Sequence, residues 1–388
     1  MVAPILITFS SLLIIAFFFD ITSSRTKIPS AILLLVLGWA VRETTTAMHI
    51  EMPDMSKVLP VLGTIGLILI VLEGSLELRL NKERLPLVSK SAIIAFFPIL
   101  LFSFGLAYAF DYYTGVGIKN GLANAIPLAV ISSAIAIPSA KHLHERDREF
   151  VTYESSLSDI FGVIFFNFIT LNEHIGAGSF VSFIVELVIM LAITLIATLL
   201  LAFLLSKIDH HIKYTPIILM VLLVYSIAKL YHLPALVFIL LLGLFLGNLN
   251  QLTHLPVIKK LKPEVLEDEV PKFGELTMEI AFLIRATFFI LFGYMIKTSE
   301  LLHGATLEWS IPITTGIFAL RFIFLKYFRL PTYPLLFLAP RGLITILLFL
   351  SIPLAQKCAL ANESLIIQVI LFSALIMMTG LVTTRKKA

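Results

Sequence analysis

Apolar residues occur along this chain in long continuous runs, which short polar or Pro- and Gly-marked breaks separate. A helix needs about 20 mostly apolar residues to cross about 30 Å of hydrocarbon. The pattern therefore predicts an all-α membrane protein with about thirteen transmembrane helices. The runs at 29–43 and 214–230 are short, so twelve spans is the alternative. The runs cover residues 2–20, 29–43, 57–79, 86–110, 120–141, 148–171, 178–206, 214–230, 233–250, 275–297, 307–329, 331–356 and 362–383.

The composition is typical of a membrane protein, and the sequence lacks the signals of several other functions. Hydrophobic residues make up 59% of the chain and charged residues 14%, with a mean hydropathy of +0.99, whereas soluble domains carry about 25% charge. No basic tract pairs with aromatic residues, so nucleic acid is not an expected partner. Serine hydrolase, Walker and HExxH motifs are absent, and the histidines lack metal-ligand spacing. We expect no enzyme, no cofactor and no resident metal.

Basic residues in the connections predict the orientation. Cytoplasmic loops of membrane proteins carry an excess of Lys and Arg. The odd-numbered connections and the C-terminal tail hold 20 of them, among which are Arg79, Lys82, Lys259, Lys260 and Lys262, while the even-numbered connections hold 6. This alternation predicts a multi-pass protein of the cell (inner or plasma) membrane, with its N-terminus outside and its C-terminus in the cytoplasm.

Two halves of the chain share a pattern. Pro29 is followed by Gly38 nine positions later, as Pro234 is by Gly243, and the next run in each half has a Gly-centred match between 72–75 and 291–294. The copies lie seven spans apart, and an odd offset inverts one relative to the other. Inverted repeats are typical of secondary transporters, with sites between the copies at mid-membrane. We predict a single transporter unit over 1–388. Its repeats are expected at about 1–171 and 214–383, linked by a helix at 178–206.

Prolines predict that one helix in each half is interrupted. Pro127 and Pro138 flank residues 131–137, and Pro340 precedes Arg341 in the run 331–356. A proline removes a backbone donor, and broken backbone at membrane depth requires protein or a water-filled cavity around it. Ser132 and Ser133 lie beside the first break. Their hydroxyls could satisfy freed carbonyls or ligate a cation directly.

Charged residues inside the predicted spans are the candidate functional groups, because such residues are costly in hydrocarbon. At about 1.5 Å per residue, Glu154 lies about 9 Å and Arg321 about 12 Å from the cytoplasmic side. Their matched depth and opposite charge predict a structural ion pair. Arg341 follows the second proline break, where it could neutralise half-helix carbonyls or take part in transport. Arg285 receives no assignment.

Asp159 lies near the midplane without an obvious partner. A carboxylate removed from water there is suited to hold a proton or a cation near neutral pH. Ser155 lies one turn before it, Ser158 is adjacent, and oxygen ligands of this kind suit hard cations. The alternative is a plain salt bridge from Asp159 to Arg285 or Arg341. Glu73 lies at a level similar to Glu154 and is either a further ligand or a structural carboxylate.

The segment Glu154-Ser155-Ser156-Leu157-Ser158-Asp159 resembles the monovalent cation:proton antiporter superfamily, particularly its sodium/proton exchanger branch. That branch carries Glu-Ser-x-x-Asn-Asp on its ion-binding helix. Residues 69–74 and 288–293 resemble the corresponding family helices, Arg321 falls at an arginine that pairs with the motif glutamate, and Pro340-Arg341-Gly342 resembles the Arg-Gly of the second crossing helix.

The resemblance implies a homodimer with a dimerisation domain and a core domain that moves as an elevator. The core would comprise about 57–171 and 275–356. It also implies a secondary active transporter that exchanges Na⁺, or Li⁺ or K⁺, for H⁺ and serves pH homeostasis. The ion would bind Asp159 with help from Ser155 and Glu73, and Ser158, Ser132 and Ser133 complete the candidate set. One-for-one, electroneutral exchange is expected because the motif has one aspartate.

Two departures from the family pattern leave other functions open. Ser158 replaces the asparagine, and Ser133-Ala134-Ile135 stands where the first crossing helix has Thr-Asp. Ser132-Ser133 resembles the potassium-efflux branch, so a K⁺ efflux or channel-like module is one alternative. It would pass cations without a coupled pH change. A non-transporting membrane sensor or scaffold is another, and its carboxylates would tolerate amide substitution.

Overall fold

The structure is a computed structural model that describes residues 2–26, 28–49, 57–78, 84–141, 143–172, 176–207, 214–231, 233–249, 263–301 and 303–383. Within these ranges it is built from helices alone, as the hydropathy pattern predicts. The elements are α1 (Val2–Thr26), α2 (Ser30–Ala47), α3 (Val58–Glu77), α4 (Leu85–Thr114), α5 (Ile118–Ala129), α6 (Ser133–Ala140), α7 (Glu145–Leu171), α8 (Ala177–Lys207), α9 (Tyr214–Leu230), α10 (Ala235–Gly247), α13 (Pro263–Met295), α14 (Thr298–Leu301), α15 (Gly304–Tyr327), η1 (Leu335–Phe337), α16 (Leu343–Leu350), η2 (Leu354–Gln356) and α17 (Glu363–Thr383).

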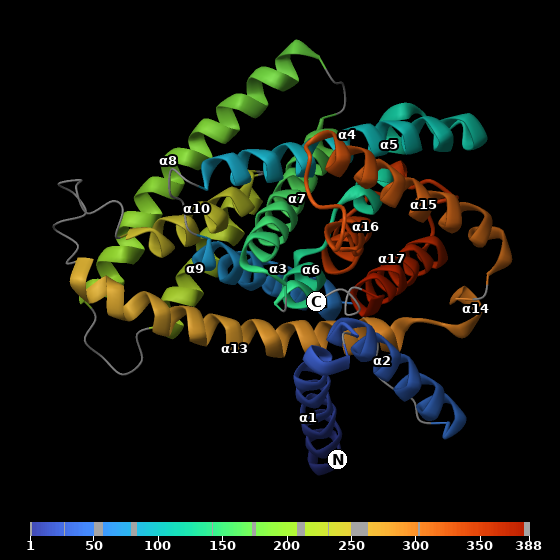
Figure 1. Ribbon diagram of the computed structural model, residues 1–388, viewed down its shortest axis with the longest axis horizontal. Helices are drawn as coiled ribbons and strands as arrows, with labels where there is room; N and C mark the ends of the chain where they lie inside the picture. Colours follow the sequence, from blue (N-terminus) through green and yellow to red (C-terminus); the bar gives the residue numbers. More distant parts are fainter. Residues whose placement is uncertain are drawn as a thin grey trace.

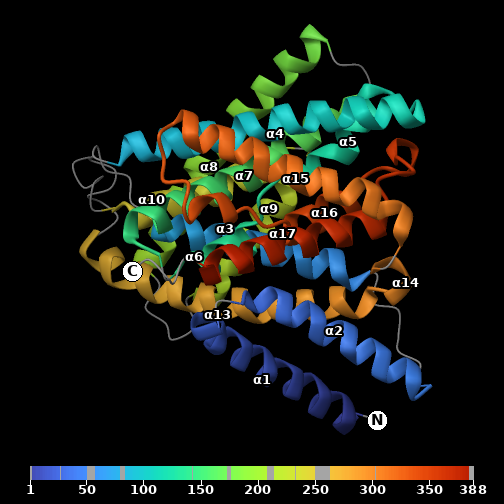
Figure 2. The ribbon, with the colours of Figure 1, turned by 45° about the vertical axis from the view of Figure 1, so that its right-hand side comes forward.

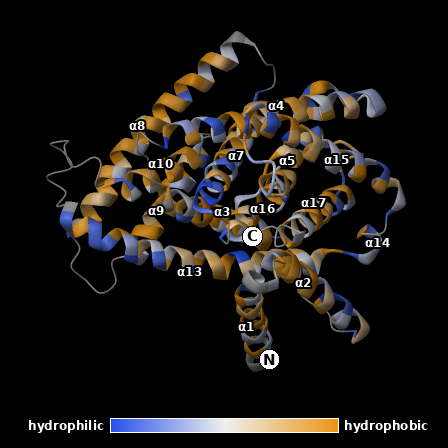
Figure 3. Ribbon diagram, in the orientation of Figure 1, coloured by the Kyte–Doolittle hydropathy of each residue, from blue (hydrophilic) through white to orange (hydrophobic). Residues whose placement is uncertain are grey.

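Every predicted span contains a helix or an interrupted helix, so the predicted fold class is confirmed. Nine segments in the described ranges are long and apolar enough to cross a membrane, and α9 and α10 are shorter apolar helices. The largest difference is in α13, which begins at Pro263 rather than near 275. Its first turns carry several acidic residues, and Figure 3 shows this end of α13 as hydrophilic. Hydropathy therefore identifies only the apolar part of this helix.

The helices surround a central group formed by α3, α6, α7 and α16 (Figure 1). Helices α4, α5 and α15 lie on one side of this group, and α1, α2 and α13 lie on the opposite side (Figures 1 and 2). Large apolar side chains are exposed on outer helices, for example Ile196 of α8 at 69%. Such a surface is suited to contact with lipid.

The glycines that define the sequence repeat are sites of close helix contact. A Cβ added to Gly38 of α2 would lie 2.8 Å from the backbone nitrogen of Tyr294 in α13. A Cβ added to Gly243 of α10 would overlap the side chain of Ser75 in α3. Tyr294 and Ser75 are the matched residues that end the two Gly-centred segments. The Pro–Gly helix of each predicted repeat therefore packs against a helix of the other predicted repeat.

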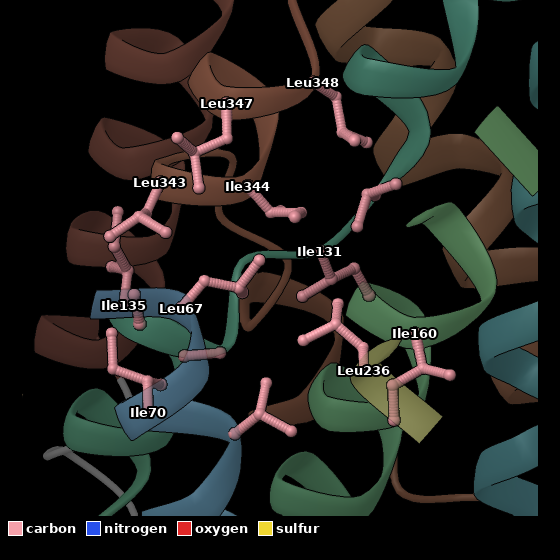
Figure 4. Close-up of a cluster of buried hydrophobic side chains, with 14 of the residues drawn as sticks. Leu67, Ile70, Ile131, Ile135, Ile160, Leu236, Leu343, Ile344, Leu347 and Leu348 are labelled. Carbon is pink, nitrogen blue, oxygen red and sulfur yellow. The ribbon is translucent and has the colours of Figure 1, made fainter. Parts of the chain in front are cut away.

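The two interrupted helices cross at the centre of the molecule. The first consists of α5 and α6 with extended backbone between them. The second leads from η1 through residues 338–342, which have no regular secondary structure, into α16. Their breaks touch directly, because the Ser132 backbone N–H donates to the Pro340 carbonyl at 2.9 Å. Figure 4 shows buried side chains of both segments, Ile131 and Ile135 from the first and Leu343 and Ile344 from the second. The proline pattern thus located both breaks.

The predicted orientation depends in part on residues that the structure does not describe, and the arrangement of the helices alone does not place either terminus. Arg79, Lys82, Lys259, Lys260 and Lys262 all lie outside the described ranges. The outside N-terminus and the cytoplasmic C-terminus therefore stay predictions.

Candidate functional site

Helix α7 carries the polar residues of the site through the centre of the molecule. The spacing of four residues places Glu154 with Ser158 and Ser155 with Asp159 on neighbouring turns of one face. All four side chains are at most 1% exposed. Ionisable groups so fully removed from solvent require partners or a bound ion.

Both carboxylate oxygens of Glu154 are bonded, and its partner is Arg321, with which its depth predicted an ion pair. Arg321 of α15 binds both carboxylate oxygens of Glu154, and the contact from Nη2 to Oε2 measures 2.8 Å. Arg321 Nε also donates to the Leu335 carbonyl at 2.8 Å. A bidentate pair of this kind fixes both charges and their orientation. It ties α7 to α15 and to the chain just before the second break.

Only one of the two carboxylate oxygens of Asp159 has a hydrogen-bond partner among the described residues. Its Oδ2 accepts a hydrogen bond from the hydroxyl of Ser133, the first residue of α6. Its Oδ1 is buried and has no hydrogen-bond partner among the described residues. The N-terminus of α6 adds a partial positive charge near the carboxylate. Neither Arg285 nor Arg341 forms a salt bridge with Asp159 within the described part of the chain, so the structural alternative for this aspartate is not supported.

The other predicted serines differ in their availability. Ser158 Oγ accepts a hydrogen bond from the Ile131 backbone N–H at 2.9 Å and so holds the first break against α7. Ser155 Oγ donates to the Val151 carbonyl of its own helix at 2.7 Å. Ser132 Oγ is buried without a hydrogen-bond partner in the described ranges. In this conformation Ser133 is bonded to Asp159, whereas Ser155 is not.

Arg341 caps the C-terminus of α5, the first half of the first interrupted helix. Its Nε donates to the Leu128 carbonyl at 2.8 Å and its Nη2 to the Ala129 carbonyl at 3.0 Å, while its Nη1 donates to the Ala339 carbonyl at 2.7 Å. Helix α5 ends at Ala129, and a helix C-terminus leaves carbonyls without partners. The arginine therefore supplies, from the second crossing segment, the donors that the first one lacks.

Glu73 is half-buried on α3, beside the point where α3 meets α7. A Cβ at the adjacent Gly74 would lie 3.3 Å from Ser156 Oγ, so Gly74 permits this close approach. Arg285 of α13 is 8% exposed. The structure thus assembles Asp159, Ser133, Ser132 and Ser158 around the crossing and leaves Arg285 separate from these bonds.

Sequence reasoning did not single out three buried polar residues. Ser156 Oγ has no hydrogen-bond partner within the described ranges. Ser373 of α17 accepts a hydrogen bond from the Arg341 backbone N–H at 3.0 Å. Asn124 of α5 links to the Gln356 carbonyl at 2.7 Å and to the Cys358 backbone N–H at 3.1 Å. A polar residue within an apolar run was the available signal for Asn124 and Ser373.

Comparisons with known proteins agree with this architecture. The chain is similar to the sodium proton antiporter MjNhaP1 from Methanocaldococcus jannaschii. Its structure at pH 8 gives a TM-score of 0.68 and 18% identity over 97% of this chain and 94% of that one. A structure from an electron-microscopy map of the same antiporter gives 0.70 and 17%, over 99% and 96%. At such identities the likeness shows the fold. No curated protein sequence matches the chain.

The family assignment follows from a match over nearly the whole chain. The family described as "Sodium/hydrogen exchanger, transmembrane" matches residues 10–385. That range includes α7, both interrupted helices and the Glu154–Arg321 pair. The chain is therefore a transporter rather than an enzyme, a multi-pass membrane protein of the cation:proton antiport class, and it belongs to the sodium/hydrogen exchanger family.

Proposed function

We propose that this protein exchanges Na⁺ for H⁺ across the membrane by alternate occupation of Asp159, with Li⁺ and K⁺ as further candidate cations. The observation that carries the proposal is the asymmetric environment of the Asp159 carboxylate. One oxygen is held by Ser133, and the other is buried with no partner among the described residues. A carboxylate that is removed from water and has an unbonded oxygen is stabilised when a proton or a cation binds and cancels its charge.

The surrounding groups suit a small hard cation. Ser132 is 1% exposed, and its hydroxyl, beside the first break, has no hydrogen-bond partner among the residues that the structure describes. It offers an oxygen ligand of the type that such cations prefer. Ser133 and Ser158 hold the carboxylate and the break in place, and Glu73 and Ser155 complete the proposed ligand set from α3 and α7. Carboxylate and hydroxyl oxygens together can replace part of the hydration shell of the ion.

We infer one-for-one, electroneutral exchange. The Glu154 carboxylate is paired with the Arg321 guanidinium through two hydrogen bonds, so the pair adds no net charge. Asp159 then carries one negative charge, which either one proton or one monovalent cation cancels. The Asp159 carboxylate is therefore neutral with either ion bound, and movement of the site carries no net charge of the transported ion in either direction.

The proposed assembly is a homodimer in the cell membrane, with its N-terminus outside and its C-terminus in the cytoplasm. Residues of about 57–171 and 275–356 would form the mobile core. Cross-linking in native membranes tests the dimer, and labelling of single introduced cysteines from either side of the membrane tests the orientation.

Transport by purified protein in liposomes that contain a pH-sensitive dye tests the function. We expect Na⁺, Li⁺ or K⁺ on one side to drive proton movement to the other, and Asp159→Asn to abolish the signal. Glu186→Gln is the matched control, because it removes a half-buried carboxylate of α8 that is remote in sequence from the crossing. Full exchange by Asp159→Asn would contradict the proposal, and cation flux without a pH change would indicate a channel-like module.

A further inference from the structure

A small cavity lies behind the crossing, on the side of α4. Its volume is about 20 Å³, and its lining includes Ala95 and Pro98 of α4, Ile131 of the first break, Ser158, Arg321 and Arg341. A cavity of this size holds about one water-sized particle. Asp159, Ser132 and Ser133 do not line it, so the cavity is distinct from the Asp159 carboxylate, and Ser158 is the candidate residue that borders it.

The cavity is rich in hydrogen-bond donors. A guanidinium has five N–H groups. Arg321 uses three of its N–H groups on Glu154 and Leu335, and Arg341 uses three on backbone carbonyls. Ser158 accepts a bond from Ile131, which leaves its own hydroxyl hydrogen available to donate. Two arginines and a serine among the lining residues therefore retain donors that no hydrogen bond within the described ranges uses.

The formal charges of the arginines that line the cavity, together with the Glu154 that pairs with Arg321, do not sum to zero. Arg321 and Arg341 carry two positive charges, and Glu154, paired with Arg321, carries one negative charge. Both arginines are at most 4% exposed. Backbone carbonyls, which are dipoles without formal charge, are the partners that the structure shows for the Arg341 side chain. An uncompensated charge in a buried membrane site is costly, and a negative ion beside it offsets that cost.

We propose that this cavity binds one small monovalent anion of the chloride class. Spare guanidinium and hydroxyl donors would replace its hydration shell, and its charge would balance Arg341. The rival occupant is an ordered water, which would need acceptors for its two hydrogens. One backbone acceptor is near, because Pro98 has no N–H to pair with the Ile94 carbonyl within α4. The charge balance favours the anion.

The first test measures thermal unfolding of the purified full chain at constant ionic strength. We expect replacing gluconate by chloride or bromide to raise the unfolding temperature by at least about 2 °C, since a ligand that binds only the folded state stabilises it. Ala95→Val fills the cavity and should remove this rise. Ala109→Val is the matched control, because it adds the same two methyl groups to α4 in an apolar groove, and it should keep the rise.

Equal unfolding temperatures in gluconate and halide, or an unchanged rise in Ala95→Val, would overturn the anion site. A second measurement uses the unaltered chain and is independent of any variant's folding. Crystals grown with bromide should show an anomalous peak between Arg321, Arg341 and Ser158. A water there, with no anomalous signal, would refute the proposal. Neither readout involves ion exchange, so both results stand whether or not Asp159 carries the transported ion.

Discussion

Glu154 and Asp159 lie five residues apart on α7 and are equally buried, yet their carboxylates differ in how many hydrogen-bond partners they have. Glu154 receives a bidentate guanidinium and has both oxygens bonded. Asp159 receives one hydroxyl and keeps one oxygen without a partner in the described ranges. The difference separates two uses of a membrane carboxylate. We expect a carboxylate with both oxygens bonded to fix the positions of helices, and one with an unbonded oxygen to bind and release an ion.

Breaking the Glu154–Arg321 pair should produce the largest effect on stability. Glu154→Gln leaves Arg321 buried without its counter-charge, and removing one partner of such a pair costs about 3–5 kcal/mol. Thermal unfolding in detergent measures the loss. The double variant Glu154→Leu with Arg321→Met removes both charges and should recover most of it. Equal stability of Glu154→Gln and the unaltered chain would contradict a structural role for the pair.

The second prediction concerns the arginine that joins the two crossing segments. Arg341→Met removes three donors from backbone carbonyls, and we expect a loss of about 2–4 kcal/mol in stability, together with weakened exchange. Arg285→Met is the control, because this equally long side chain is buried and shows no hydrogen bond in the described part of the chain. If Arg285→Met were the more damaging variant, the capping role of Arg341 would be wrong.

A smaller effect is expected at the hydroxyl that holds Asp159. Ser133→Ala removes one hydrogen bond to the carboxylate, worth about 1–1.5 kcal/mol, and should weaken apparent cation affinity about five- to tenfold. Concentration dependence of exchange in liposomes gives this affinity. Ser139→Ala, on the same short helix, removes a hydroxyl bonded to the Ile135 carbonyl and should leave affinity unchanged. Similar losses in both variants would point to general damage to α6.

The smallest effect should come from Ser155, the serine of the α7 motif one turn before Asp159. We expect Ser155 to be the weakest of the proposed ligands, because its hydroxyl must give up its bond to its own helix to reach the ion. Ser155→Ala should therefore alter apparent cation affinity by less than the Ser133 variant, within about twofold. The same liposome assay applies. A loss at Ser155 larger than that at Ser133 would mean that α7 presents Ser155 to the ion in another conformation of the carrier.

Hydropathy and proline positions were sufficient to predict the helical membrane fold, both breaks and the depth match of Glu154 with Arg321. These features follow from local chemistry: apolar length, the missing proline donor, and residue rise along a helix. The close contacts that Gly38 and Gly243 make with helices of the other half of the chain also had a sequence signal, since small residues permit close approach of membrane helices.

The partners of individual atoms could not be predicted in the same way. Arg341 binds the carbonyls of Leu128 and Ala129, and backbone carbonyls look alike in every sequence. The division of roles between Ser133 and Ser155 depends on how two helices meet, which periodicity does not encode. The polar start of α13 was missed because its acidic turns lack the apolar signal.

The most direct test counts the protons released when a cation binds to the purified protein. Isothermal titration in two buffers of different ionisation enthalpy gives this number. If Asp159 holds either ligand but never both, the protein should release close to one proton per Na⁺ bound at a pH where Asp159 starts protonated, and Asp159→Asn should show neither binding nor release. Tight cation binding with no proton released, or unchanged binding by Asp159→Asn, would contradict the account.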